Sequence, residues 1–121
     1  MDWELDKNRA ICPQICERIS VEIASGALVA HDKLLSVREL AVRLGVNPNT
    51  VQKAFEQLET QRLIYSVRGS GWFVGEEADV AKEVVDQMIA NKIQTLFRDL
   101  QMLGITAQQI KAYVKEWTDH E

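Results

Sequence analysis

The stretch that decides the fold is LLSVRELAVRLGVNPNTVQKAFEQLE at residues 34–59, followed by TQRLIYSV at 60–67 and RGSGWFV at 68–74. Two helical patterns with a glycine between them lead into two strand patterns joined by a glycine-rich turn. This order predicts a winged helix-turn-helix, in which one helix enters the DNA major groove and a β-hairpin lies beside it.

The helix ends are marked by local signals. Ser36 is expected to cap the first helix, because Glu39 three residues later completes a capping box, and Gly45 is expected to end that helix. Asn47 is expected to cap the second helix, with Pro48 at its first position, where the missing N–H costs nothing. A helix from about Cys12 to Ser25 is predicted upstream, from isoleucines repeated every four residues.

Polar side chains are expected on the outer face of the second helix. Its apolar residues follow helical spacing and define an inner face of Val51, Ala54, Phe55 and Leu58. The outer face then carries Asn49, Thr50, Gln52, Lys53 and Glu56. Amides and hydroxyls suit base edges, and lysine suits phosphates. A merely solvated face is the more common meaning of such residues, but the turn before and the hairpin after favour DNA.

Charge is distributed unevenly along the 121 residues. The net charge is −4, yet residues 33–74 carry six basic and three acidic side chains. This basic excess falls on the segment that would face phosphates, and Arg68 lies at the hairpin tip, where a solvated arginine is the alternative. There is no apolar run of about 18 residues and no secretion signal at the N-terminus, so a cytoplasmic protein without membrane contact is expected.

These motifs resemble those of the GntR family of bacterial transcription regulators over roughly residues 8–74. The matching motifs are Leu34-Leu35-Ser36-Val37-Arg38-Glu39-Leu40-Ala41, Val46-Asn47-Pro48-Asn49-Thr50-Val51 and Arg68-Gly69-Ser70-Gly71-Trp72-Phe73-Val74. The resemblance implies that Arg38 contacts phosphate or base and that the wing contacts DNA through Arg68 and Gly69. The full candidate DNA-binding set is Ser36, Arg38, Asn47, Pro48, Asn49, Thr50, Gln52, Lys53, Arg68, Gly69 and Ser70.

Several positions depart from the family pattern. Leu35 replaces a proline and Ala30-His31 replaces a common Pro-Gly, which is expected to alter only the connector. Pro48 and Gln52 stand where many members carry arginine, so the operator of those relatives cannot be transferred to this chain. Gln61-Arg62 replaces a frequent acidic-Gly pair, which is expected to change the turn into the hairpin.

The 47 residues after Val74 are expected to form two short helices. A heptad-like seam runs along the first and is broken by Gly104; its members are Val85, Ile89, Ile93, Leu96, Leu100 and Leu103. Thr106 and Gln109 form a second capping box, which predicts the start of the last helix. The seam could pack back on the winged domain, but pairing with a second copy is favoured because DNA-reading helices usually work as symmetric pairs.

The tail is similar to that of the YtrA-like subfamily, whose members are small dimeric repressors often linked to transporter operons. Two helices committed to a dimer are expected to leave little room for a drug-sized pocket of roughly 300–1,000 Å³. No small-molecule effector is indicated by the residues themselves.

Other chemistry is sparse. Cys12 and Cys16 lie one helical turn apart, and buried reduced thiols are favoured over a metal or redox pair. No nucleophile–base pair, phosphate loop or metal-ligand spacing occurs, so neither an enzyme nor a cofactor is expected.

The sequence therefore predicts a mainly α, α+β protein with a winged helix-turn-helix domain at 1–75 and a helical dimerisation tail at 76–121. The expected function is a homodimeric repressor that binds a pseudo-palindromic operator and occludes a promoter. A winged-helix protein–protein adaptor and a thiol or metal sensor are the alternatives.

Overall fold

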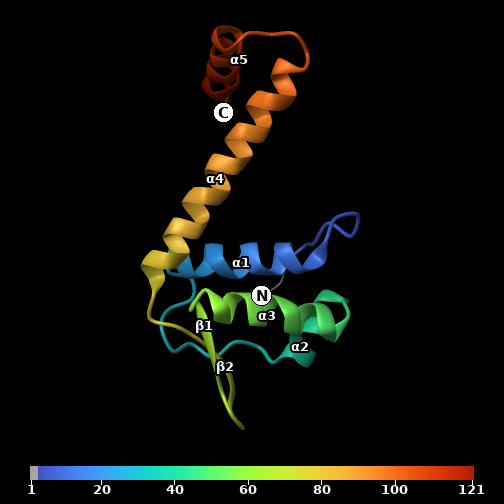
Figure 1. The fold of residues 1–121 in the computed structure, drawn as a ribbon, viewed down its shortest axis with the longest axis vertical. Helices are drawn as coiled ribbons and strands as arrows, with labels where there is room; N and C mark the ends of the chain where they lie inside the picture. The colour runs from blue at the N-terminus through green and yellow to red at the C-terminus, as the bar shows by residue number, and fades with distance from the viewer. Residues whose placement is uncertain (1–2) are drawn as a thin grey trace. The chain divides into compact units, whose positions relative to one another are not determined.

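The computed structural model describes residues 3–121, so Met1 and Asp2 of the predicted domain 1–75 lie outside the described residues. The chain forms two compact units, residues 1–85 and 86–121. The predicted mainly α fold with one small sheet is confirmed (Figure 1). In chain order the elements are α1 (Ile11–Ser25), α2 (Val37–Leu44), α3 (Pro48–Thr60), β1 (Ile64–Val67), β2 (Gly71–Val74), α4 (Ala78–Gln101) and α5 (Ala107–Asp119).

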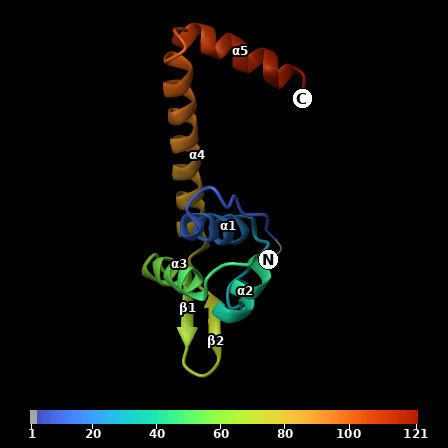
Figure 2. The same ribbon diagram turned by 90° about the vertical axis from the view of Figure 1, so that its right-hand side faces the viewer.

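Three helices build the body of the first unit, with α1 and α2 both packed on α3 (Figure 2). The isoleucine repeat of α1 buries Ile15, Ile19 and Ile23, and Gly26 ends this helix with a left-handed φ of 84°. A glycine favours this conformation because it has no Cβ to clash with the following carbonyl. The inner face expected for α3 is confirmed, because all four of its apolar side chains are buried.

The wing is an antiparallel hairpin in which Ser66 pairs with Trp72 and Val67 with Gly71. The glycine-rich turn was expected to comprise residues 68–71, but Gly71 belongs to β2. The connector between α1 and α2 also runs along this sheet. Lys33 forms an isolated antiparallel β-bridge with Phe73, and the Leu34 N–H donates to the Trp72 carbonyl at 2.9 Å. Sequence patterning did not predict this third segment, since pairing partners distant in the chain leave no local signal.

The core of the first unit continues past the wing. Phe55 of α3 is fully buried and meets the Trp72 ring edge-on, with ring centroids 5.4 Å apart. Ala81, on the first turns of α4, is also fully buried in this core, and Val80 is partly buried against it. The start of α4 therefore stabilises the winged unit. The predicted functional division after residue 75 stays a prediction, while the compact unit extends to residue 85.

The second unit consists of the rest of α4 and α5, joined by a short loop (Figure 1). The first of the two tail helices is long rather than short, with 24 residues. The second begins as predicted, because Thr106 accepts a hydrogen bond from the Gln109 N–H in a complete capping box. Ile110 is the one fully buried apolar side chain described in this unit.

Candidate nucleic-acid interface and tail surface

The helix-turn-helix is fixed by the caps that the sequence predicted. Ser36 accepts a hydrogen bond from the Glu39 N–H while the Glu39 carboxylate accepts one from the Ser36 N–H, each at 3.1 Å. The hydrogen bond from the Ser36 backbone N–H to the carboxylate, followed by the interaction with the Ser36 side chain, lowers the pKa of Glu39. Gly45 ends α2 with a φ of 67°, and the Asn47 side chain then accepts from the Asn49 N–H at 2.8 Å to cap α3. Both helix starts are therefore held by side chains.

Lys7 also holds this turn, and sequence reasoning missed it. Its ammonium donates to the Leu44 carbonyl at 2.9 Å and to the Gly45 carbonyl at 3.3 Å. These carbonyls lie at the C-terminus of α2, where a cation satisfies otherwise unpaired acceptors and complements the helix dipole. The two contacts span 37 and 38 positions of the chain, so no local sequence motif predicts them.

The outer face of α3 presents the candidate base-reading residues to solvent. Asn49 and Lys53 are exposed, and Thr50 and Gln52 are half-buried at the edges. The Gln52 amide donates to the Glu56 carboxylate at 3.1 Å, one helical turn away. A base contact by Gln52 would have to replace this exposed hydrogen bond, which contributes little on its own.

A groove of about 470 Å³ lies along α2, lined by Arg38, Glu39, Val42 and Arg43. Val42 is 83% exposed although it is a large apolar side chain. Two arginines beside an exposed aliphatic side chain offer hydrogen bonds to phosphate and apolar contact to sugar, which is a combination suited to a nucleic-acid backbone.

The wing tip carries the remaining candidates, Arg68, Gly69 and Ser70, all exposed. The Ser70 N–H donates to the Val67 carbonyl at 2.9 Å, and Gly69 has a φ of 82°, which this tight turn requires and glycine adopts most easily. The candidates thus lie on three elements of the first unit: the N-terminal turn of α2, the N-terminal half of α3 and the tip of the hairpin.

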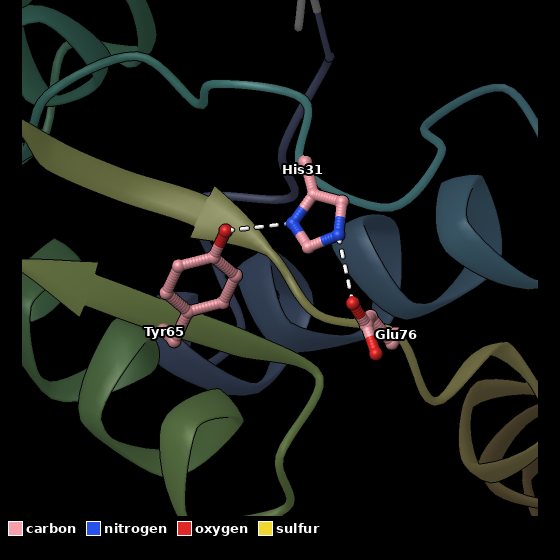
Figure 3. Close-up of polar contacts among 3 residues, drawn as sticks. All are labelled: His31, Tyr65 and Glu76. Atoms are coloured by element: carbon pink, nitrogen blue, oxygen red, sulfur yellow. Dashed lines mark hydrogen bonds and ion pairs between the residues drawn. The ribbon is translucent and has the colours of Figure 1, made fainter.

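The expectation that Ala30-His31 alters only the connector is wrong. The His31 imidazole contacts Tyr65 of β1 and Glu76 after β2, each at 2.8 Å (Figure 3). Gln61-Arg62 also departs from the family pattern. Arg62 has a left-handed φ of 64°, the conformation that glycine adopts most easily. The turn before β1 therefore has a glycine-type backbone without a glycine.

Most of the predicted seam lies along one stripe of α4, but it is shorter than expected. Ile89, Ile93 and Leu96 are exposed, while Val85 and Leu100 are half-buried. Leu103 does not belong to the helical seam, because α4 ends at Gln101 and the chain then turns through Gly104, whose φ is 85°.

An apolar groove of about 450 Å³ lies within the second unit, lined by Leu96, Tyr113, Val114, Trp117 and Thr118. The expectation that a tail committed to a dimer leaves little enclosed space of drug-sized volume stays a prediction, because this groove is open at the surface of a single subunit. Trp117 is 67% exposed here, which is unusual for the largest apolar side chain. Together with the seam, these residues form the tail's exposed apolar surface.

The sequence model described as "Bacterial regulatory proteins, gntR family" matches residues 13–74, from α1 to the end of β2. This is just over half of the chain. The chain belongs to the gntR family.

Similar proteins extend the comparison beyond that segment. The HTH-type transcriptional repressor YtrA of Bacillus subtilis (strain 168) is 34% identical over 107 residues, which cover 88% of this chain and 82% of YtrA. A GntR family transcriptional regulator from Listeria monocytogenes is 38% identical, with a TM-score of 0.78 over 93% of this chain and 98% of that one. Both alignments are longer than the winged domain, so the tail takes part in them, in agreement with a YtrA-like subfamily.

A second solved structure contains operator DNA. The DNA-binding domain of AraR in complex with operator ORE1 is 35% identical, with a TM-score of 0.51 over 62% of this chain and 87% of that one. The gntR-family protein is thus a regulator with a winged helix-turn-helix DNA-binding domain, and the relatives that it matches are regulators and not enzymes.

The Cys16 thiol of this gntR-family chain lies in an unreactive environment. Burial, with Cys12 as the next cause, raises the pKa of the Cys16 thiol to about 12. Its Sγ lies 3.5 Å from both the Ala54 carbonyl and the Gln57 amide oxygen on α3. Because the thiolate is the reactive and metal-binding form, this geometry does not favour a thiol sensor. Within residues 3–121 no group of three or more His, Cys, Asp or Glu side chains is placed to hold a metal ion.

No helix in the described part of the chain is long and apolar enough to cross a membrane.

Proposed function

We propose that this protein is a homodimeric, sequence-specific DNA-binding repressor. Each subunit inserts α3 into the major groove of one half-site, and the two half-sites form a pseudo-palindromic operator. The observation that carries the proposal is the doubly capped helix-turn-helix, whose second helix exposes amide, hydroxyl and ammonium groups beside an arginine-tipped wing. The operator complexes of AraR, a similar domain, support the same mode of binding.

The candidate residues divide into two roles. Arg38, Lys53 and Arg68 neutralise phosphates, so they set affinity and its salt dependence. Asn49, Thr50 and Gln52 read base edges, so they set sequence preference. Ser36, Asn47 and Pro48 fix the starts of the two helices, and Gly69 and Ser70 shape the wing tip beside Arg68.

The homodimer is proposed to form through the tail. Ile89, Ile93 and Leu96 on α4, with Tyr113 and Trp117 on α5, are all exposed in one subunit. Burying such side chains contributes about 1.5–3 kcal/mol each, so five of them on each subunit could offset the cost of association. A second copy supplies a matching surface, because a two-fold interface uses the same patch on both subunits.

Repression by occlusion follows from this arrangement. A dimer that holds two successive major grooves covers about one to two helical turns of promoter DNA, which blocks access by polymerase. YtrA is a repressor, and this chain resembles it along most of its length. Action at a promoter places the protein in the bacterial cytoplasm, with control by protein level or by a small ligand.

Selection from a random-sequence duplex library with the full-length protein tests DNA recognition directly. We expect retained duplexes to share a pseudo-palindromic motif and affinity to fall on the order of a hundredfold between 50 and 200 mM salt if about four phosphates are contacted. A salt-insensitive protein partner and no retained duplex would instead identify an adaptor.

Substitutions then assign the roles. Arg38→Ala and Arg68→Ala should weaken binding to every duplex, and Asn49→Ala or Gln52→Ala should relax sequence preference by about 1–3 kcal/mol. Arg18→Ala removes an equal charge from an exposed position of α1 and serves as the matched control. If all four variants behaved like Arg18→Ala, the assigned DNA face would be wrong.

Sedimentation of Ile93→Asp tests the dimer. Ile93 is 51% exposed in one subunit, so an aspartate should leave the subunit folded but bury a charge in the proposed interface. We expect monomers and a collapse of operator affinity, because each half-site is then bound independently. Gln94→Asp adds the same charge at a neighbouring exposed position of α4 and should remain dimeric. A dimeric Ile93→Asp variant would place the interface elsewhere.

A further inference from the structure

One side chain in the connector between α1 and α2 links two parts of the wing region. His31 Nδ1 lies 2.8 Å from the Tyr65 hydroxyl on β1, and His31 Nε2 lies 2.8 Å from a Glu76 carboxylate oxygen in the linker 75–77 (Figure 3). Figure 3 shows the imidazole between the two partners, with one ring nitrogen directed at each. The connector, the wing strand and the linker to α4 are therefore joined through a single ring.

The hydrogen-bonding groups match in either protonation state of the imidazole. In the neutral ring with a proton on Nε2, the Tyr65 hydroxyl donates to Nδ1 and Nε2–H donates to the Glu76 carboxylate. In the charged ring both nitrogens donate, and the Tyr65 oxygen accepts. The bridge therefore does not require a change of protonation to form.

Backbone contacts hold the same three segments close together. The His31 N–H donates to the Val74 carbonyl and the Gly75 N–H to the Leu63 carbonyl, each at 2.8 Å. A Cβ at Gly75 would lie 2.8 Å from the Arg62 carbonyl oxygen, so the linker passes too close to that turn for any other side chain. The linker is fixed on the first unit before α4 begins.

The backbone of His31 is itself in a less favourable conformation. Its φ is 71°, and Arg62, with a φ of 64°, is the other non-glycine residue with positive φ among those described. Both line one depression of about 380 Å³, together with Tyr65 and Glu76. A left-handed conformation in a residue with a Cβ costs energy and persists where surrounding contacts determine it.

We propose that His31 is a positioning residue for DNA binding, because it holds the wing strand to the linker and so sets the wing tip for its phosphate contact. The inference rests on the proposed function. Tyr65 also stacks on Phe73 of β2, with ring centroids 5.7 Å apart, so a restraint on its hydroxyl acts on both strands of the hairpin. Arg68 lies at the tip of that hairpin and responds to its position.

Hydrogen exchange of the β1 and β2 amides in the free, full-length protein tests the restraint without DNA. His31→Asn is the informative variant, because asparagine tolerates a left-handed backbone but is too short to reach both partners. We expect exchange to rise about threefold to fivefold, which corresponds to losing one or two exposed hydrogen bonds. His120→Asn makes the same change at the chain's other histidine and should leave the wing amides unaffected. Unchanged exchange in His31→Asn would overturn the proposal.

A double-mutant cycle with Arg68→Ala tests the role in binding, with the duplex that the wild-type protein selects from a random library as the probe. His31→Asn should weaken binding about threefold to fivefold, and the loss caused by Arg68→Ala should be smaller in the His31→Asn background. His31→Gln, which can still donate and accept, should restore both the affinity and the coupling. Additive effects, or unchanged affinity with faster exchange, would overturn the role in positioning. If the wild-type protein selected no duplex, the proposed function would fail, and so would positioning for DNA, while the exchange measurement would still decide whether His31 restrains the wing.

Discussion

The two compact units differ in how they treat their apolar side chains. The first unit contains fifteen of the sixteen buried apolar residues described, and three of its large apolar side chains are exposed. The second unit buries Ile110 and exposes eight large apolar side chains, including Ile93, Trp117 and Leu103. The first unit therefore closes its own core, whereas the stability of the second depends on what covers its surface.

Folding and assembly therefore depend on different units of the chain. A substitution in the first unit should act on the free energy of unfolding of each subunit. The same substitution in the second unit should act on association and leave the subunit folded. Matched pairs of variants, one in each unit, therefore distinguish a loss of folding from a loss of association.

The largest contrast is expected from a buried charge. Leu58→Asp places a carboxylate in the fully buried core of the first unit and should cost more than about 5 kcal/mol, enough to unfold a marginally stable domain. Leu96→Asp makes the same change on the exposed stripe of α4 and should leave a folded monomer. Circular dichroism and sedimentation measure the two outcomes. An unfolded Leu96→Asp chain would show that the stripe belongs to the subunit's own core.

A smaller contrast is expected from removing an aromatic ring. Phe55→Ala should lower the free energy of unfolding by about 3–5 kcal/mol, because it leaves a cavity beside Trp72. Trp117→Ala should change the stability of a monomeric background such as Ile93→Asp by less than about 1 kcal/mol, since the ring is mostly exposed. Urea denaturation at two protein concentrations separates the effects. Comparable losses for both variants in that background would contradict the contrast.

The two capping boxes allow a finer comparison. Ser36→Ala should cost about 1 kcal/mol in the unfolding of the first unit, because the Glu39 N–H loses its partner. Thr106→Ala removes the same interaction at the start of α5 and should increase amide exchange mainly within α5. Chemical denaturation and residue-resolved exchange check the pair. Global destabilisation by Thr106→Ala would mean that the two units unfold together.

The smallest effect is expected at the thiols of the first unit. The raised pKa of Cys16, about 12, keeps this thiol protonated at pH 8, so alkylation of the native protein should be slow there and should quicken only at much higher pH. Mass spectrometry after timed alkylation of Cys12→Ser and Cys16→Ser measures each remaining thiol separately. Fast modification of Cys16 at pH 8 in folded protein would revive the thiol-sensor alternative.

Local signals in the sequence predicted the features that local forces determine. Short stretches of sequence, none longer than the residues 51–58 of the α3 inner face, predicted the capping boxes at Ser36 and Thr106, the cap at Asn47 and that inner face, and the structure confirms all of them. The wing was predicted as a hairpin for the same reason. Leu63 was expected in the first strand and Gly71 in the turn, whereas β1 begins at Ile64 and β2 at Gly71, because strand boundaries depend on the pairing register.

Features that join distant residues were not predictable. Lys7 contacts α2 across 37 positions, and His31 contacts Tyr65 and Glu76 across 34 and 45. The burial of Ala81 depends on tertiary packing, which a single small residue in the sequence does not predict. Leu103 was misassigned because its spacing fits the seam, whereas the end of α4 is set by the backbone at Gly104. The proposed DNA-binding set itself remains a prediction.

The close passage of Gly75 against the Arg62 carbonyl bears on how such regulators could exchange their C-terminal parts during evolution or in the laboratory. A crossover before residue 75 would require the incoming segment to supply a glycine at that position, and a crossover between residues 75 and 81 would replace Ala81, which is buried in the core of the first unit. A graft that keeps residues 1–85 and replaces the chain from residue 86 leaves that core intact. The most suitable crossover point therefore lies inside α4 rather than in the linker 75–77 before it.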